Sequence, residues 1–91
     1  MRIEVEIVNE LGLHARPAAE FVRCCQRYKC EITLWKEGSS FSAASILEVL
    51  MANLDCGTRM EIEAIGDDAE AALERLRRLL VEFREQEERG A

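Results

Sequence analysis

The chain contains one histidine, His14, and the residues around it suit the binding of an anion. It lies in the segment Gly12-Leu13-His14-Ala15-Arg16-Pro17, directly before a stretch with helical periodicity. The first N–H groups of a helix lack intrahelical acceptors and carry partial positive charge, so they favour phosphate. Arg16 adds a full charge and a planar set of donors that match phosphate oxygens. We therefore predict an anion site at His14.

A histidine placed in this way is also able to accept a phosphoryl group, because a neutral imidazole is a nucleophile near neutral pH. Pro17 suits the first turn of a helix and leaves the N–H groups of Ala15 and Arg16 free to face the site. A single histidine at a helix start is, however, often only a cap or a surface residue. The residue types alone therefore indicate an anion site and leave covalent phosphorylation open.

Apolar periodicity predicts the elements that position this segment. Residues 2–7 alternate as a strand does, and a helix with buried positions at spacings of three and four follows Pro17. Strands are expected near 30–36 and 39–42, then a short helix from Ser45, then a strand over 59–64. We expect the short helix to turn one face inward, formed by Ile46, Val49, Leu50 and Leu54. The last helix is predicted to follow Asp67 as its cap, with the apolar stripe Leu73, Leu76, Leu80 and Phe83.

This order predicts an α+β domain with two layers, in which a four-stranded sheet has one solvated face and all helices on the other. A ferredoxin-like fold shares most of the element order, and periodicity does not separate the two. The chain has 91 residues, of which 48% are hydrophobic and 33% charged, so we expect one domain over 1–91 with a frayed end.

The charge and the apolar segments exclude several kinds of partner. The net charge of −6 disfavours nucleic acid, whose phosphates are bound mainly by lysine and arginine clusters. No apolar stretch approaches the roughly 20 residues of a membrane helix, and the first residues lack the apolar core of a secretory signal. A cytoplasmic protein without membrane insertion is therefore expected. The acidic run over 82–88 is interpreted as a solvated helix end.

Four cysteines do not form a recognisable site. Cys24, Cys25, Cys30 and Cys56 match neither paired zinc ligands nor a redox motif, and only one histidine is available to assist them. We expect buried thiols that act as small apolar residues, with no metal site and no disulfide.

The segment from Gly12 to Ala18 resembles the active-site signature of the HPr family, the phosphocarriers of the bacterial phosphotransferase system. Ser45-Ile46-Leu47 resembles the second segment of that family. Gly57-Thr58 and the stretch 64–68 also fit. The resemblance implies an open-faced β-sandwich with the order βαββαβα, in which the antiparallel strands lie in the order 1-4-2-3 and three helices cover one face.

The same resemblance implies a function. An Enzyme I-type protein, phosphorylated by phosphoenolpyruvate, would pass the phosphoryl group to Nδ1 of His14, with Arg16 and the amides of Ala15 and Arg16 steadying it. His14 would then donate to an EIIA-type domain, in sugar uptake or in nitrogen-related regulation. Leu47, Glu48 and Leu50 would belong to the docking surface. We expect a monomeric carrier with a covalent phosphohistidine and no cofactor, not a free-standing enzyme.

Ser45 matches the position that a dedicated HPr kinase phosphorylates in some lineages, although a serine at a helix start is also an ordinary cap. Leu11 stands where the family often has asparagine, and its apolar side chain is expected to remove a hydrogen bond that orders the loop. Glu48 and Glu10 add negative charge near the docking surface, which bears on the choice of partner.

Two other functions stay open. A regulatory binding module would keep the fold and act through Ser45 or through docking, without phosphoryl relay. A ferredoxin-like domain that binds a metal or a small ligand is disfavoured by the unpatterned cysteines.

Overall fold

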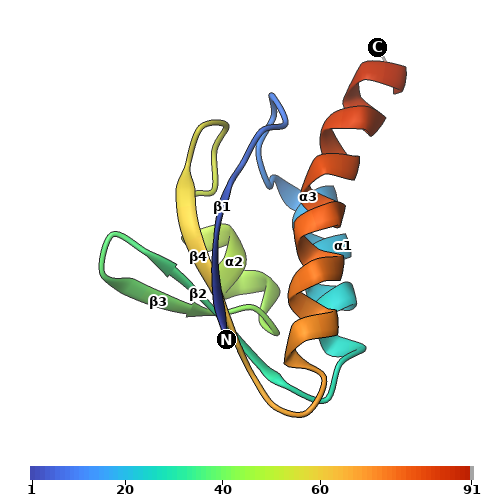
Figure 1. Ribbon diagram of the computed structural model, residues 1–91. Helices are drawn as coiled ribbons and strands as arrows, with labels where there is room; N and C mark the ends of the chain where they lie inside the picture. The colour runs from blue at the N-terminus through green and yellow to red at the C-terminus, as the bar shows by residue number, and fades with distance from the viewer. Residues whose placement is uncertain (91) are drawn as a thin grey trace.

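The computed structural model describes residues 1–90, so Ala91, at the end expected to fray, lies outside the described residues. The elements are β1 (Arg2–Glu6), α1 (Ala15–Gln26), β2 (Glu31–Lys36), β3 (Ser39–Ser42), α2 (Ile46–Met51), β4 (Arg59–Ile65) and α3 (Ala69–Gly90). The strands form one antiparallel sheet in the order β1-β4-β2-β3, and the helices cover one of its faces (Figure 1). The predicted fold class and strand order are confirmed.

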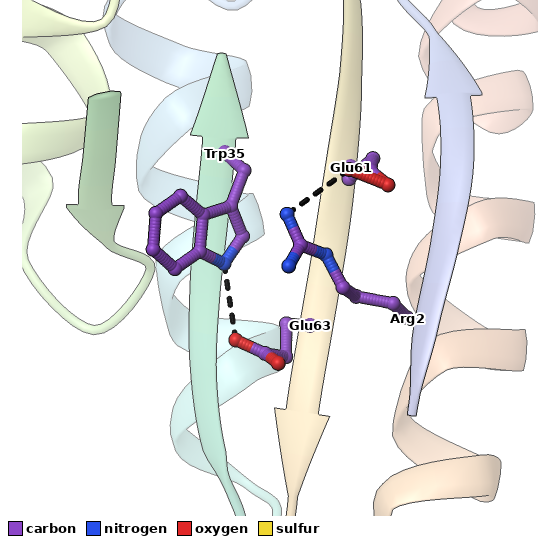
Figure 2. Close-up of polar contacts among 4 residues, drawn as sticks. All are labelled: Arg2, Trp35, Glu61 and Glu63. Atoms are coloured by element: carbon purple, nitrogen blue, oxygen red, sulfur yellow. Dashed lines mark hydrogen bonds and ion pairs between the residues drawn. The ribbon is translucent and has the colours of Figure 1, made fainter. Parts of the chain in front are cut away.

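The face of the sheet turned away from the helices carries polar and aromatic side chains (Figure 2). Arg2 of β1 lies over the ring of Trp35 of β2, 4.8 Å from its centroid, and donates a hydrogen bond of 3.0 Å to Glu61 of β4. The indole Nε1 of Trp35 donates a hydrogen bond of 3.0 Å to Glu63, which also lies on β4. These contacts join three neighbouring strands on the solvated face, where an exposed ion pair is worth at most about 1 kcal/mol.

The opposite face forms the hydrophobic core with the helices. Phe21 of α1, Leu34 of β2, Ile62 of β4 and Leu76 of α3 are among the largest side chains that are fully buried. The stripe predicted for the last helix is confirmed, because all four of its residues are buried. In Figure 1, α3 lies along the molecule, and its last turns reach the level of the loop that follows β1.

The start of α3 differs from the prediction. The helix begins at Ala69, and Asp68, not Asp67, is the residue directly before it. The carbonyl of Asp68 accepts the N–H of Ala72 at 2.9 Å, and its Oδ2 accepts the N–H of Lys29 at 2.8 Å. The bond from the Lys29 N–H lowers the pKa of the Asp68 carboxyl. Asp68 is therefore held at the start of α3 by a tertiary contact with Lys29, which the sequence pattern does not show.

The inward face predicted for the short helix is only partly correct. Val49 is fully buried, and Leu54, which follows the helix, is 3% exposed. Ile46 and Leu50 were expected to be buried but are 38% and 39% exposed. A helix of six residues rests on the core through little more than one side chain, so its flanking apolar residues stay at the surface.

The four cysteines differ in their burial. Cys24 and Cys25 are buried in α1, as predicted, and burial raises the pKa of both thiols. Cys30 is half-buried, whereas Cys56 is exposed in the loop before β4. The prediction of a buried thiol is therefore wrong for Cys56, because this residue lies in a surface loop outside the periodic elements.

Candidate functional site

His14 is the residue directly before α1, with extended backbone torsions of φ −77° and ψ −171°. Its carbonyl accepts the N–H of Ala18 at 2.9 Å and so closes the first turn of the helix. The imidazole is exposed and makes no capping hydrogen bond. The histidine therefore starts the helix through its backbone alone, and its side chain is accessible from solvent.

Ala15, Arg16 and Pro17 form the first turn of α1, as predicted. The N–H groups of Ala15 and Arg16 have no intrahelical acceptor because of their position, and proline has no N–H. This turn contains no acidic residue. Arg16 is exposed and takes part in none of the ion pairs found within residues 1–90. The positive end of α1 is therefore not neutralised by a carboxylate of its own first turn.

The backbone that leads into His14 is a tight turn from Asn9 to Gly12. The N–H of Gly12 donates to the carbonyl of Asn9 at 3.1 Å, and Nδ2 of Asn9 donates back to the carbonyl of Gly12 at 2.7 Å. Gly12 has φ +66°, and a Cβ atom there would lie 2.6 Å from the carbonyl oxygen of Leu54. Glycine is therefore required on two grounds, the left-handed backbone and the close approach of another chain segment.

Glu87 of α3 binds the same turn from the other side. Its Oε1 accepts the N–H of Glu10 at 2.6 Å, and its Oε2 accepts the N–H of Leu11 at 3.0 Å and Nδ2 of Asn9 at 3.2 Å. The acidic run over 82–88 is thus more than a solvated helix end, and the interpretation is wrong for this residue. One signal was present in the sequence, since Glu87 follows the buried Phe83 by four residues and so shares its face.

These bonds set the ionisation of Glu87. Partial burial opposes its charge, but the N–H of Leu11, the amide of Asn9 and the N–H of Glu10 favour it, as does the charge of His14. The bonds and the charge outweigh burial, so the pKa of Glu87 is lowered below its ordinary value. Leu11 itself is 66% exposed and offers no polar side-chain atom. Asn9 and Glu87 therefore supply the side-chain hydrogen bonds of this loop.

Ser45 is the residue directly before α2, and its Oγ accepts the N–H of Glu48 at 3.3 Å. Oε1 of Glu48 in turn accepts the N–H of Ser42 at 2.9 Å. The serine therefore caps α2, which is the structural role that a serine at a helix start commonly has. Glu48 is engaged in a backbone contact within its own segment, a role that the sequence did not indicate.

The residues expected to dock partners lie on α2, which packs against α1. Leu47 is 69% exposed and Leu50 is 39% exposed, and Met51, the last residue of α2, is 67% exposed. Lys36 donates from Nζ to the carbonyls of Ala52 and Asn53 at 2.8 and 3.0 Å, which fixes the end of the helix. The structure therefore presents a small exposed apolar surface next to α1.

Comparison with known proteins identifies the family. The family described as the PTS HPr component phosphorylation site matches residues 1–82. The phosphocarrier protein HPr of Haemophilus influenzae is 41% identical over 73 residues, which are 80% of this chain and 86% of that protein. A crystal structure of HPr from Bacillus anthracis is similar with a TM-score of 0.84 and 34% identity, covering 87% of this chain and 94% of that one.

A third relative broadens the comparison. A crystal structure of the catabolite repression protein Crh of Bacillus subtilis has a TM-score of 0.73 and 35% identity, covering 87% of this chain and 91% of that one. That structure of Crh is a dimer with a swapped domain, so a monomeric state of this chain stays a prediction. The match over residues 1–82, together with the strand order and the identity to HPr proteins, shows that the chain belongs to the HPr family of phosphotransferase-system phosphocarriers.

Proposed function

We propose that the chain carries a phosphoryl group on His14 between an Enzyme I-type donor and an EIIA-type acceptor. The observation that carries this proposal is the exposed imidazole at the start of α1, which makes no capping hydrogen bond although its backbone begins the helix. A histidine used only for capping would be committed to the helix N–H groups. The side chain of His14 instead stays available to successive partners.

The transfer itself follows from the groups around the ring. Nδ1 of the neutral imidazole, the atom used in this family, attacks the phosphorus of the donor's phosphohistidine. The new N–P bond forms as the donor's N–P bond breaks, and the donor imidazole leaves with the electron pair. Arg16 and the N–H groups of Ala15 and Arg16 stabilise the phosphoryl oxygens, with Pro17 fixing the start of the helix. In the second transfer His14 is the donor: a nucleophile of the acceptor attacks the phosphorus, the N–P bond of His14 breaks, and the imidazole of His14 leaves with the electron pair.

Docking is assigned to the exposed apolar residues of α2. Leu47 and Leu50 offer apolar area that a partner can cover, and the carboxylate of Glu48 lies between them in the sequence. Because Glu48 already accepts the N–H of Ser42, its charge is held near the start of α2. Such a fixed negative charge would act mainly on the choice of partner and on the association rate.

Regulation through Ser45 is the second candidate function, and the similarity to Crh favours it. An HPr kinase acting there would place about −1.5 to −2 charge beside the docking residues. Ser45 is half-buried, and its hydroxyl accepts the N–H of Glu48. In this alternative the chain acts by docking, without phosphoryl relay through His14.

The setting of the carrier completes the proposal. Within residues 1–90, none of the helices has both the length and the apolar character needed to cross a bilayer. We infer a cytoplasmic, monomeric carrier formed by one domain over 1–91 that works without a cofactor. A monomer leaves His14 exposed to one partner after another, as a relay requires.

The test is phosphorylation by phosphoenolpyruvate and the cognate Enzyme I-type protein, followed by intact mass. We expect one added phosphoryl group that is labile in acid, and its complete loss in His14→Ala. Labelling of His14→Ala to the extent of the wild type would contradict the site. No labelling of the wild type would contradict the relay. A phosphoryl group stable in acid and lost in Ser45→Ala would instead support the regulatory alternative.

A further inference from the structure

The position of His14 depends on a contact with the far end of the chain. Glu87 lies in the last turns of α3, 78 residues along the chain from Asn9, and its carboxylate holds the turn that leads into His14. We propose that Glu87 is a positioning residue for phosphoryl transfer, acting by holding the Asn9–Gly12 turn in place. This proposal rests on the proposed function, because it concerns the rate of transfer through His14.

The three donors of the turn require a carboxylate. The N–H groups of Glu10 and Leu11 lie in the middle of the turn, and such consecutive N–H groups form a concave anion site. Glu87 accepts them with separate oxygens, and the second oxygen also accepts the amide of Asn9. A glutamine in its place would offer one oxygen and one NH₂ group, which would face an N–H donor. A neutral replacement of equal size therefore loses part of the contact.

The turn is held on both sides, which explains how Glu87 affects His14. On one side, Gly12 lies against the backbone of Leu54, and the N–H of Leu13 donates to the carbonyl of Leu54 at 2.8 Å. On the other side lies Glu87. Leu13 is 4% exposed and directly precedes His14, so the histidine follows a buried residue attached to the turn. Without Glu87, the turn keeps its two internal bonds between Asn9 and Gly12 and its contact with Leu54, but the N–H groups of Glu10 and Leu11 lose their acceptor.

Glu87 is separate from the machinery that the family shares. The family match covers residues 1–82, and Phe83 is the last buried residue of α3. The turns that follow add nothing to the hydrophobic core, so replacement of Glu87 should leave the fold intact. Its polar contacts are made to the turn, and Glu10, Arg84 and Glu88 are the charged groups that line a surface hollow with it.

The test compares Glu87→Gln with Glu85→Gln, a control with the same loss of charge on the same turns of α3, at an exposed position. Phosphoryl transfer from the phosphorylated Enzyme I-type protein is followed by rapid quench, which gives kcat and KM for each carrier. Amide hydrogen exchange at Glu10 and Leu11 is measured in parallel. Glu87→Ala serves as the second variant if the glutamine variant fails to fold.

We expect Glu87→Gln to lower kcat about tenfold with KM nearly unchanged, because a displacement of about 1 Å at a reacting group can cost up to 100-fold. Exchange at Glu10 and Leu11 should accelerate, and Glu85→Gln should match the wild type in both measurements. Equal kcat values in the two variants, or a change in KM alone, would overturn the positioning role while the relay stands. Absence of transfer to the wild type would instead overturn the proposed function.

Discussion

Two helix ends meet at the loop before His14, and the sequence encodes them in different ways. The start of α1 is a local motif, in which His14, Arg16 and Pro17 follow one another within four positions. The end of α3 contributes Glu87 through bonds that span 76 to 78 residues of chain. Local spacing predicted the first end. The second depends on how the helix packs, so only the folded chain brings it to the loop.

The two ends also have opposite electrostatic roles. The start of α1 offers N–H donors and has no acidic residue in its first turn. At the neighbouring turn, by contrast, the carboxylate of Glu87 already accepts the hydrogen bonds of the N–H donors. Because the N–H groups of Glu10 and Leu11 are already paired with Glu87, they would not be open to the phosphoryl group that we propose on His14. In the proposed transfer, that group would therefore be bound by the donors at the start of α1.

The largest effect on phosphoryl transfer is expected from removal of Arg16 at the start of α1. Arg16→Ala removes the one full positive charge in the first turn of α1, and we expect kcat/KM for phosphoryl transfer to fall about 100-fold, as for other donors to developing negative charge. Arg23→Ala, an exposed arginine in the last turn of the same helix, is the control. Rapid-quench kinetics measures both variants. An equal loss in both would assign the effect to net charge and contradict a direct role of Arg16.

The connection between the two ends can be broken at Gly12. Gly12→Ala places a Cβ atom 2.6 Å from the carbonyl of Leu54 in a residue with φ +66°, and we expect about 2 kcal/mol of destabilisation. Gly38→Ala is the matched control, because φ is +81° there but an added Cβ would meet no atom within 4 Å beyond its two chain neighbours. We expect it to cost about 1 kcal/mol, from backbone strain alone. Urea unfolding measures both, and equal costs would contradict the close packing of the loop.

The sequence predicted most of the fold because the periodicity of the longer elements matches their burial. The alternation of β4 and the stripe of α3 both appear in the structure. The failures occur where tertiary contacts decide. Asp68, which accepts the N–H of Lys29, stands directly before α3 where Asp67 was expected, and the short α2 leaves Ile46 exposed. The start of α1 directly after His14 was predictable from one motif, whereas the support of its loop by Glu87 was not.

Acid should weaken the contact at the end of α3 selectively. The pKa of Glu87 is lower in the folded chain than its ordinary value, so the carboxylate contributes stability that is complete above the ordinary pKa. This contribution is lost as the pH falls from that ordinary value through the folded pKa. We therefore expect the stability difference between wild type and Glu87→Gln to shrink over this acidic range.

Unfolding in urea, measured at neutral pH and at several acidic values, tests this dependence. The groups near Glu87 also titrate or carry charge, namely Glu10, Cys56, Arg84 and Glu88 beside it and His14 beyond the turn. Glu85→Gln controls for the general effect of charge at this end of α3. A difference between wild type and Glu87→Gln that stayed constant with pH would contradict an ionised contact.

The smallest effect on stability is expected at Ser45. Its side chain caps the start of α2, whereas the side chain of His14 makes no such bond at the start of α1. The single bond from the Glu48 N–H to Oγ is 3.3 Å long, so Ser45→Ala should cost only about 0.5 kcal/mol, the lower end for a lost cap. Ser40→Ala, at an exposed position of β3, is the control. If thermal unfolding shows a loss of about 2 kcal/mol at Ser45, the hydroxyl has a larger structural role. A serine held that firmly would be a poor substrate for a kinase, because phosphorylation would have to break the cap.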